Sequence, residues 1–341
     1  SRPDSRNQWS SIKALDGETP NEKKERLLKE EVVRLTQDGQ LKNPESRVSL
    51  SKSGEGDLLE EYASAPQGIK TGDDSRFRRC FWEIDAFEKP WLSYRTTPET
   101  TQHFDGLRYA LDWSSEGQDL ARLQGMEAWG RKGVAVQQMN DLPACLYLGS
   151  VHDSNVAPIV PDDPKHLPAI WAFCSSDDYH KEVRSIDQAL KATNTSILQI
   201  PFDLNHWQEV AEEKYPDGLP NPYSDDPTQW IFHGHPKPSE RPLQVAVARL
   251  LGFRWPAARD DNMELSDEAR EWVEKCKALD EHVDDDGIVC IPPVQGERAA
   301  ADRLRAPLAD AYGDDWGECA LQNLLAQRRY SSGGGGARHL C

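Results

Sequence analysis

Long apolar runs are missing from this sequence. None of its 341 residues lie in a run of the roughly 20 apolar residues that a membrane-spanning helix needs. The N-terminal residues also lack the charged-then-apolar layout of a secretion signal. We therefore expect a cytoplasmic protein. Hydrophobic residues make up only 37% of the chain, which favours a few modest compact units over one large core.

Paired cysteines are missing as well. The seven cysteines are scattered, odd in number and never spaced as Cys-x-x-Cys. This pattern argues against a disulfide framework and against a cysteine-based zinc site. We expect these thiols to be reduced and mostly buried. They are Cys80, Cys145, Cys174, Cys276, Cys290, Cys319 and Cys341.

Positive charge is scarce relative to negative charge. The chain has 40 Lys and Arg against 58 Asp and Glu, which gives a net charge of -18. Because phosphate contacts rely on Lys and Arg, this balance argues against nucleic acid as a partner. A nucleic-acid function therefore requires a local basic face on an otherwise acidic protein.

The pattern of apolar residues predicts an α+β fold with a mixed-sheet domain followed by a mainly helical C-terminal region. We expect a helical lead-in at 1–65, a sheet domain at 66–205, and a helical extension at 206–341 that is frayed after 330. Helices are predicted at about 20–36, 167–173, 179–190, 243–251 and 268–282. Strands are predicted at 80–84, 133–138, 145–148 and 197–200, with a strand-like segment at 288–291.

The most informative segment is 67–77, because it combines two glycines with a cluster of cations. Gly68 and Gly72 bracket Ile-Lys-Thr and permit a tight backbone turn. Four cations lie within ten residues, namely Lys70, Arg76, Arg78 and Arg79. Such a cluster could hold phosphates in spite of the acidic total. From the residues alone, an ordinary glycine turn before a strand remains an open alternative.

The order Gly-Ile-x-Thr-Gly-x-x-x-x-Phe at 68–77 resembles the opening of the target-recognition region in adenine-N6 DNA methyltransferases of the Eco57I-like group. It is also similar to the adenine methylases of the phage-growth-limitation, BREX and DISARM defence systems of bacteria. In these enzymes the turn leads into a strand with an aromatic pair, and residues 78–83 fit that place.

Further blocks extend the resemblance along the chain. The segment 167–176, with 183–184 and 200–202, resembles a helical segment that returns to the core through a short apolar-Pro strand. The segments 226–236, 242–256 and 286–294 look most like the C-terminal part of the DISARM-type methylase. The resemblance covers most of residues 60–325, so the combination is more specific than any single motif.

The resemblance implies that this portion holds double-stranded DNA, while a separate catalytic domain flips adenine and methylates its N6 from S-adenosylmethionine. The residues implied to bind DNA are Gly68, Lys70, Thr71, Gly72, Arg76, Arg78 and Arg79. The glycine-rich cofactor loop and the Asn-Pro-Pro-Tyr tetrapeptide of these enzymes are not in the sequence, and 291–294 lacks both the Asn and the aromatic residue. We therefore expect no cofactor site and no catalytic residue in this chain, and residues 1–65 to lead in from an absent catalytic domain. Other defence-system proteins are further expected partners.

Two alternatives remain open. The first is a standalone DNA- or protein-binding specificity subunit with no enzymatic activity, and a more distant one is a hydrolase or metalloenzyme. His233 and His235 could share a metal ion on a strand. No third ligand is evident, and Pro236 and Pro238 indicate a loop, so we expect no metal site here.

Overall fold

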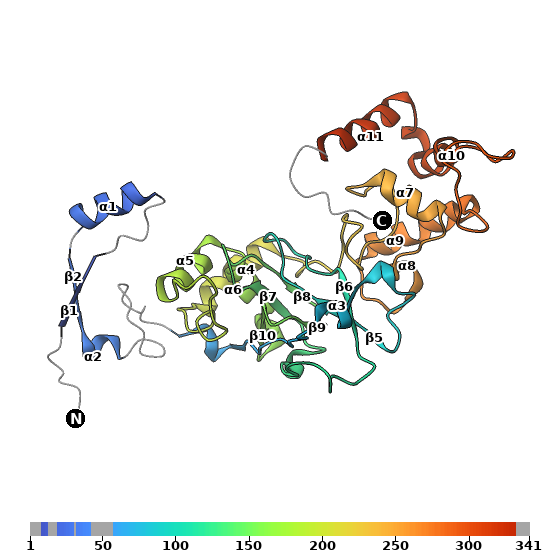
Figure 1. Ribbon diagram of the computed structural model, residues 1–341. Helices are drawn as coiled ribbons and strands as arrows, with labels where there is room; N and C mark the ends of the chain where they lie inside the picture. The colour runs from blue at the N-terminus through green and yellow to red at the C-terminus, as the bar shows by residue number, and fades with distance from the viewer. Residues whose placement is uncertain (1–7, 13–18, 31, 42–56, 332–341) are drawn as a thin grey trace. The chain divides into compact units, whose positions relative to one another are not determined.

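The computed structural model describes residues 8–12, 19–30, 32–41 and 57–331. Helices and sheets are both present and the C-terminal region is helical, so the predicted α+β fold class is confirmed (Figure 1). The chain separates into two compact units. Unit 1 comprises 1–72, 96–105 and 117–219, and unit 2 comprises 73–95, 106–116 and 220–341. The fraying expected after residue 330 falls on residues 332–341, which lie outside the described residues.

The two units interleave along the chain, which differs from the three consecutive regions 1–65, 66–205 and 206–341 expected from the sequence. Strand pairing is the reason. The central strand β6 (Tyr109–Asp112) pairs with β4 (Arg78–Cys80) on one side and with β5 (Trp91–Arg95) on the other. Two segments that precede residue 117 thereby belong to unit 2. Composition along a chain shows where strands occur but not which strands pair.

The described N-terminal residues form a two-stranded sheet and two helices. Strand β1 (Gln8–Ser11) pairs antiparallel with β2 (Val33–Thr36), and the helices are α1 (Pro20–Lys29) and α2 (Gln37–Gln40). The helix predicted at 20–36 is therefore wrong beyond Lys29. Thr19 and Glu22 form a capping box that starts α1, as a Thr-x-x-Glu sequence favours.

The sheet of unit 1 has the strand order β3-β10-β7-β8 and antiparallel pairs. Its strands are β3 (Ala63–Ser64), β10 (Val156–Pro161), β7 (Gly133–Gln137) and β8 (Ala144–Tyr147). The strands predicted at 133–138 and 145–148 are confirmed. The strand predicted at 197–200 is wrong, because the amides of Ile197 and Leu198 donate to the nearby carbonyls of Thr193 and Thr195 in a local turn.

Helix α4 packs against β7 and against α6, so it joins the sheet of unit 1 to its helical layer (Figure 1). The helices are α4 (Leu167–Cys174), α5 (Asp177–Ile186) and α6 (Leu204–Lys214), with short 3-10 turns η2 (Leu59–Glu61), η4 (Met126–Ala128) and η5 (Pro164–His166) and the short strand β9 (Val151–His152). The helical pair predicted at 167–173 and 179–190 is confirmed as far as Ile186, where α5 ends, and the prediction is wrong for 187–190. Ser176 starts α5 by accepting a hydrogen bond from the amide of Tyr179.

Unit 2 combines the three strands β4-β6-β5 with most of the helices after residue 220. Its helical elements are α3 (Asp74–Phe77), η3 (Phe81–Glu83), α7 (Pro242–Leu250), α8 (Pro256–Arg259), α9 (Asp267–Cys276), η6 (Lys277–His282), α10 (Ala300–Tyr312), η7 (Gly313–Asp315) and α11 (Glu318–Ser331). Helix α10 packs against α7 and η6. Ala246, Leu308 and Leu324 form a buried cluster from α7, α10 and α11.

Four predictions for unit 2 have different outcomes. The helices predicted at 243–251 and 268–282 are confirmed, the second with a 3-10 ending. The strand predicted at 80–84 is wrong beyond Cys80, where η3 begins. The strand-like segment predicted at 288–291 forms no strand, and its Ile291 is 84% exposed. In the described part of the chain, no helix has the length and apolar character needed to cross a membrane.

Candidate functional site

The segment 67–72 lies between two other segments of unit 1 and bonds to both. On one side, the amide of Ile69 donates to the carbonyl of His152 and the amide of Ser154 donates to the carbonyl of Ile69, both at 3.0 Å. On the other side, the amides of Lys70 and Arg122 each donate to the other's carbonyl at 3.0 Å. The motif is thus the middle of three short extended segments rather than an isolated turn.

The two motif glycines are needed for different reasons. A Cβ atom at Gly68 would lie 2.2 Å from the carbonyl oxygen of Asp153, so only glycine fits against that backbone. Gly72 has a φ of +79°, and a Cβ atom there would lie 2.9 Å from the Cβ of Ala121. The tight turn predicted from the sequence therefore depends on Gly72, whereas Gly68 allows close packing.

Lys70 and Arg122 are directly opposite each other in an antiparallel bridge, and both side chains are exposed. Directly opposed residues in such a pair place their side chains on the same face, and like charges in this position destabilise the pair. Within the described ranges, neither side chain has an ion-pair partner. Arg122 was missed by the sequence analysis, because no local motif surrounds it and the pairing spans more than 50 positions.

Thr71 is buried, with 6% of its surface exposed, and its carbonyl accepts a hydrogen bond from the amide of Ala121. Its side chain therefore lies inside unit 1 and does not form part of the exposed face that was predicted to bind DNA. The buried Thr71 helps to hold the backbone next to Lys70, whose side chain is exposed.

Two of the predicted arginines are engaged with groups of unit 2. The Nη2 atom of Arg78 lies 3.2 Å from Oδ2 of Asp74, and its guanidinium lies 4.4 Å from the centre of the Tyr109 ring. Arg79 donates from Nη1 to its neighbour's carbonyl and, at 2.6 Å, to that of Ser75. These contacts hold α3 and β4 together, which is a structural use of both side chains.

Arg76 is exposed, and its guanidinium lies 4.6 Å from the centre of the Phe77 ring. Asp73 is the N-cap of α3, and its Oδ1 accepts hydrogen bonds from the Ser75 hydroxyl at 2.6 Å and the Arg76 amide at 3.1 Å. These bonds lower the pKa of Asp73. The boundary between the units falls between Gly72 and Asp73. The seven predicted residues are thus divided, four in unit 1 and three in unit 2.

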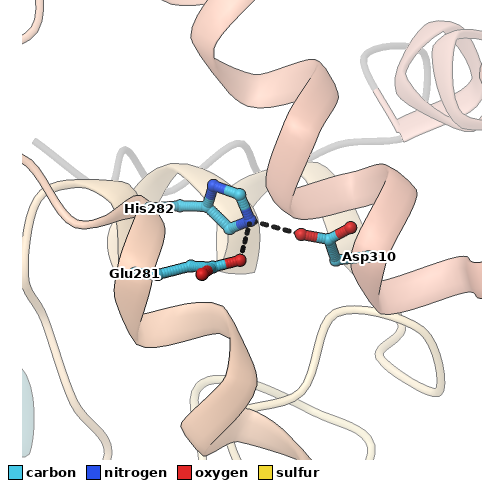
Figure 2. Close-up of side chains that lie close together, drawn as sticks. All are labelled: Glu281, His282 and Asp310. Atoms are coloured by element: carbon cyan, nitrogen blue, oxygen red, sulfur yellow. Dashed lines mark hydrogen bonds and ion pairs between the residues drawn. The ribbon is translucent and has the colours of Figure 1, made fainter.

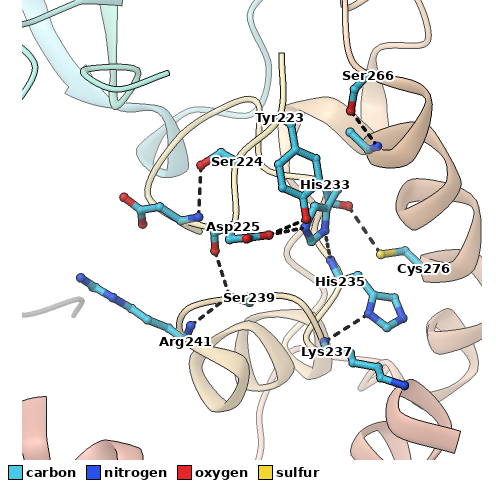
Figure 3. A network of polar contacts seen from close by, with 12 residues as sticks. Tyr223, Ser224, Asp225, His233, His235, Lys237, Ser239, Arg241, Ser266 and Cys276 are labelled. Carbon is cyan, nitrogen blue, oxygen red and sulfur yellow. Dashed lines mark hydrogen bonds and ion pairs between the residues drawn. The ribbon is translucent and has the colours of Figure 1, made fainter. Parts of the chain in front are cut away.

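His233 and His235 belong to a polar network in unit 2 (Figure 3). The amide of His235 donates to Nδ1 of His233 at 2.9 Å, and the amide of Lys237 donates to Nδ1 of His235 at 3.2 Å. Burial lowers the pKa of His233 to about 3, although Asp225 Oδ1 lies 3.8 Å from its Nε2, and lowers that of His235 to about 4. Two neutral imidazoles whose Nδ1 atoms bond to the backbone shape the 233–237 loop.

A different group brings three possible metal-ligand side chains together, and the sequence analysis missed it (Figure 2). Nε2 of His282 lies 2.5 Å from Oδ2 of Asp310 and 3.6 Å from Oε1 of Glu281. Residues 281 and 282 end η6, whereas Asp310 lies on α10. The hydrogen bond and the ion pair within the group account for this arrangement without an ion.

The strand-to-helix connection after β10 differs from a glycine-rich cradle of the kind that holds S-adenosylmethionine. Such a cradle needs a glycine-rich turn between a strand and the N-terminus of a helix. Strand β10 leads to η5 and α4 through Asp162 and Asp163, with no glycine. The β3-β10-β7-β8 sheet is antiparallel, so it has no parallel strand–helix–strand crossover.

A comparison with models of known protein families and a comparison with curated proteins both find no match to this chain.

Proposed function

We propose that the chain is the DNA-recognition portion of a site-specific adenine-N6 DNA methyltransferase from a bacterial restriction-modification or phage-defence system. The observation that carries the proposal is the exposed pair of Lys70 and Arg122, which face each other across one antiparallel bridge. Because an enzyme of this class works on DNA inside the cell, the proposal includes a location in the bacterial cytoplasm.

Two opposed cations without an anionic partner in the described residues favour binding of an external anion. Directly opposed residues of this kind have Cα atoms about 5.5 Å apart, so two long cationic side chains can reach one phosphate or two neighbouring phosphates. A phosphodiester between them replaces like-charge repulsion with two charge-assisted hydrogen bonds. Arginine and lysine both make such contacts with DNA backbones.

The geometry of the motif supports the same proposal. In the resembling pattern Gly-Ile-x-Thr-Gly-x-x-x-x-Phe, the named positions Ile69, Thr71 and Phe77 are buried here, and both glycines are required by the backbone. The x position between Ile and Thr is Lys70, which is exposed. In unit 1, residues 68–72 therefore form a support that exposes the side chain of Lys70 to a ligand.

The net charge of -18 limits where DNA can bind. The acidic remainder repels phosphate and lowers nonspecific binding, so the small basic face of 70 and 122 determines the register on DNA. Acidic faces elsewhere on the protein are available to bind other proteins of the same defence system.

The salt dependence of DNA binding tests the proposal. Each phosphate contact contributes a slope of about -0.9 to log K against log salt for duplex DNA. The variant Lys70→Gln with Arg122→Gln is therefore expected to flatten the slope by about two units and to weaken binding. The matched control is Lys165→Gln with Lys214→Gln, which removes two exposed cations of unit 1. Equal slopes in the two variants, or no binding by the wild type, would refute the proposal.

The enzymatic half of the proposal has its own test. In the intact enzyme, a catalytic domain with the glycine-rich loop and the Asn-Pro-Pro-Tyr tetrapeptide would bind S-adenosylmethionine and transfer the methyl group to adenine. Sequencing the gene upstream of the Ser1 codon decides between the two candidates. An open frame that encodes both motifs supports the methyltransferase, whereas a stop codon followed by a start site supports a standalone specificity subunit.

A further inference from the structure

Two glutamine side chains lie beside the Lys70–Arg122 pair on the same two segments. Nε2 of Gln124 donates to the carbonyl of Gly68 at 2.8 Å and to Oε1 of Gln67 at 3.5 Å. Gln67 is exposed and Gln124 is half-buried. The two amides therefore form one hydrogen-bonded unit that is partly open to solvent.

The carbonyl of Gly68 fixes which way the Gln124 amide faces. A carbonyl oxygen only accepts hydrogen bonds, so it must meet the Nε2 group and not the Oε1 atom of Gln124. Both N–H groups of Gln124 are then used, one by Gly68 and one by Gln67. The N–H groups of Gln67 and the Oε1 atom of Gln124 have no further partner among residues 57–331.

This amide pair lies close to the cations along the same two segments. Gly68 precedes Lys70 by two residues, and Gln124 follows Arg122 by two residues on the antiparallel partner segment. At about 3.3 Å per extended residue, the Cα atoms of Gly68 and Gln124 lie about 7 Å from those of Lys70 and Arg122. In DNA-binding proteins, phosphate contacts fix the position and neighbouring polar groups read the base edges.

We propose that Gln67 and Gln124 together read an adenine in the major groove, an inference that rests on the proposed function. Adenine presents an acceptor at N7 beside a donor at N6. The free N–H of Gln67 fits N7, and the free Oε1 of Gln124 fits the N6 amino group. Guanine presents two acceptors there, cytosine a donor, and thymine an acceptor with a methyl group, so none of them satisfies one donor and one acceptor.

The variant Gln67→Glu tests this role with little change of shape. A carboxylate still accepts the hydrogen bond from Gln124 but has no N–H to donate to N7. Gln118→Glu is the matched control, because Gln118 is an exposed glutamine of the same unit and the change adds the same charge. Gln67→Ala removes the same donor without the added charge.

The readout is base preference, measured by selecting bound duplexes from a randomised DNA pool at fixed salt with the full chain. We expect the wild type and Gln118→Glu to prefer adenine at one position. In both Gln67 variants, the preference for adenine over the other bases is expected to fall about tenfold. Gln67→Glu is further expected to gain preference for cytosine, whose N4 amino group suits a carboxylate. Gln67 variants that keep the preference of the control overturn the inference and leave the proposed function standing. A wild type that binds DNA without base preference overturns the inference and also contradicts site-specific recognition. A wild type that binds no DNA overturns both.

Discussion

Replacing His233 and His235 with asparagine is expected to make unit 2 more resistant to acid. Both imidazoles are almost fully buried, with 0% and 3% of their surfaces exposed. Each accepts a backbone hydrogen bond at Nδ1, which requires the neutral ring with its proton on Nε2. An asparagine Oδ1 can accept the same backbone bond but does not titrate, so the variant keeps the loop and removes the acid-sensitive group.

The direction and size of this change in stability with pH follow from the pKa values of the two histidines. In the folded protein the pKa values of His233 and His235 are about 3 and about 4, against 6.5 for an unperturbed histidine. Below pH 6.5 the unfolded chain takes up protons that the fold excludes, so stability is retained above this pH and is lost as the pH falls towards 4. At about pH 5 the loss is about 2 kcal/mol for each histidine, or about 4 kcal/mol for the pair.

Urea unfolding of the wild type and the variants at about pH 7.5 and about pH 5 measures this difference. The double variant is expected to lose about 4 kcal/mol less than the wild type between the two pH values, and each single variant about 2 kcal/mol less. Acidic residues add their own pH dependence, but it is common to all variants and cancels in the comparison. His206→Asn, at an exposed position, is the control and is expected to behave as the wild type. A double variant with the pH dependence of the wild type would refute the burial argument.

Three further outcomes are expected from local geometry. Gly68→Ala places a Cβ atom 2.2 Å from a backbone oxygen, so it is expected to cost about 3 kcal/mol of stability, measured by urea unfolding. Among the described cysteines, exposed Cys319 is expected to react with a thiol reagent in the native state, whereas buried Cys174, whose pKa is raised by burial, reacts only after unfolding; mass spectrometry of the labelled protein checks both. The hydrogen bond from Tyr62 to the Asp57 carboxylate raises the pKa of Tyr62 to about 12, so Asp57→Asn is expected to lower the pKa of one phenol in an ultraviolet titration.

Local sequence signals predicted five helices, but they gave no bounds for α6, α10 or α11. The starts of α1 and α5 carry Thr19 and Ser176 as N-caps, and each side chain accepts a backbone hydrogen bond, as is typical of such caps. The prediction beyond Lys29 was wrong because the apolar residues Val32, Val33 and Leu35 fit a helical stripe as well as a strand, and pairing with β1 decides for the strand. Apolar spacing does not reveal a partner strand elsewhere in the chain.

The candidate site was only partly predictable for the same reason. Lys70 and the two glycines stand out in the sequence, because cations and glycines cluster there. Arg122 and Gln124 do not, since their relation to the motif arises from backbone pairing with a distant segment. The sequence also does not show that Arg78 and Arg79 have partners within the fold. Both side chains bind groups of α3 and thereby hold α3 and β4 together.

The interleaved units lead to a last prediction, that residues 206–341 do not fold by themselves. Although most helices of unit 2 lie in this range, its strands β4, β6 and β5 lie before residue 117. Leu107 shows the dependence, because its amide donates to Oε1 of Gln229 at 2.7 Å and its carbonyl accepts from the amide of Trp230 at 2.8 Å.

The folding stability that the fragment loses can be calculated from the buried side chains that it lacks. Phe77, Phe81, Tyr94, Leu107 and Leu111 are at least 95% buried and are all missing from 206–341. At about 2 kcal/mol for each buried side chain, their absence removes about 10 kcal/mol, which is as much as the whole stability of a typical domain. The fragment is therefore expected to show no cooperative thermal transition by circular dichroism, whereas the full chain shows one. A cooperative transition in the fragment would mean that the helices after residue 220 hold a core without the three strands.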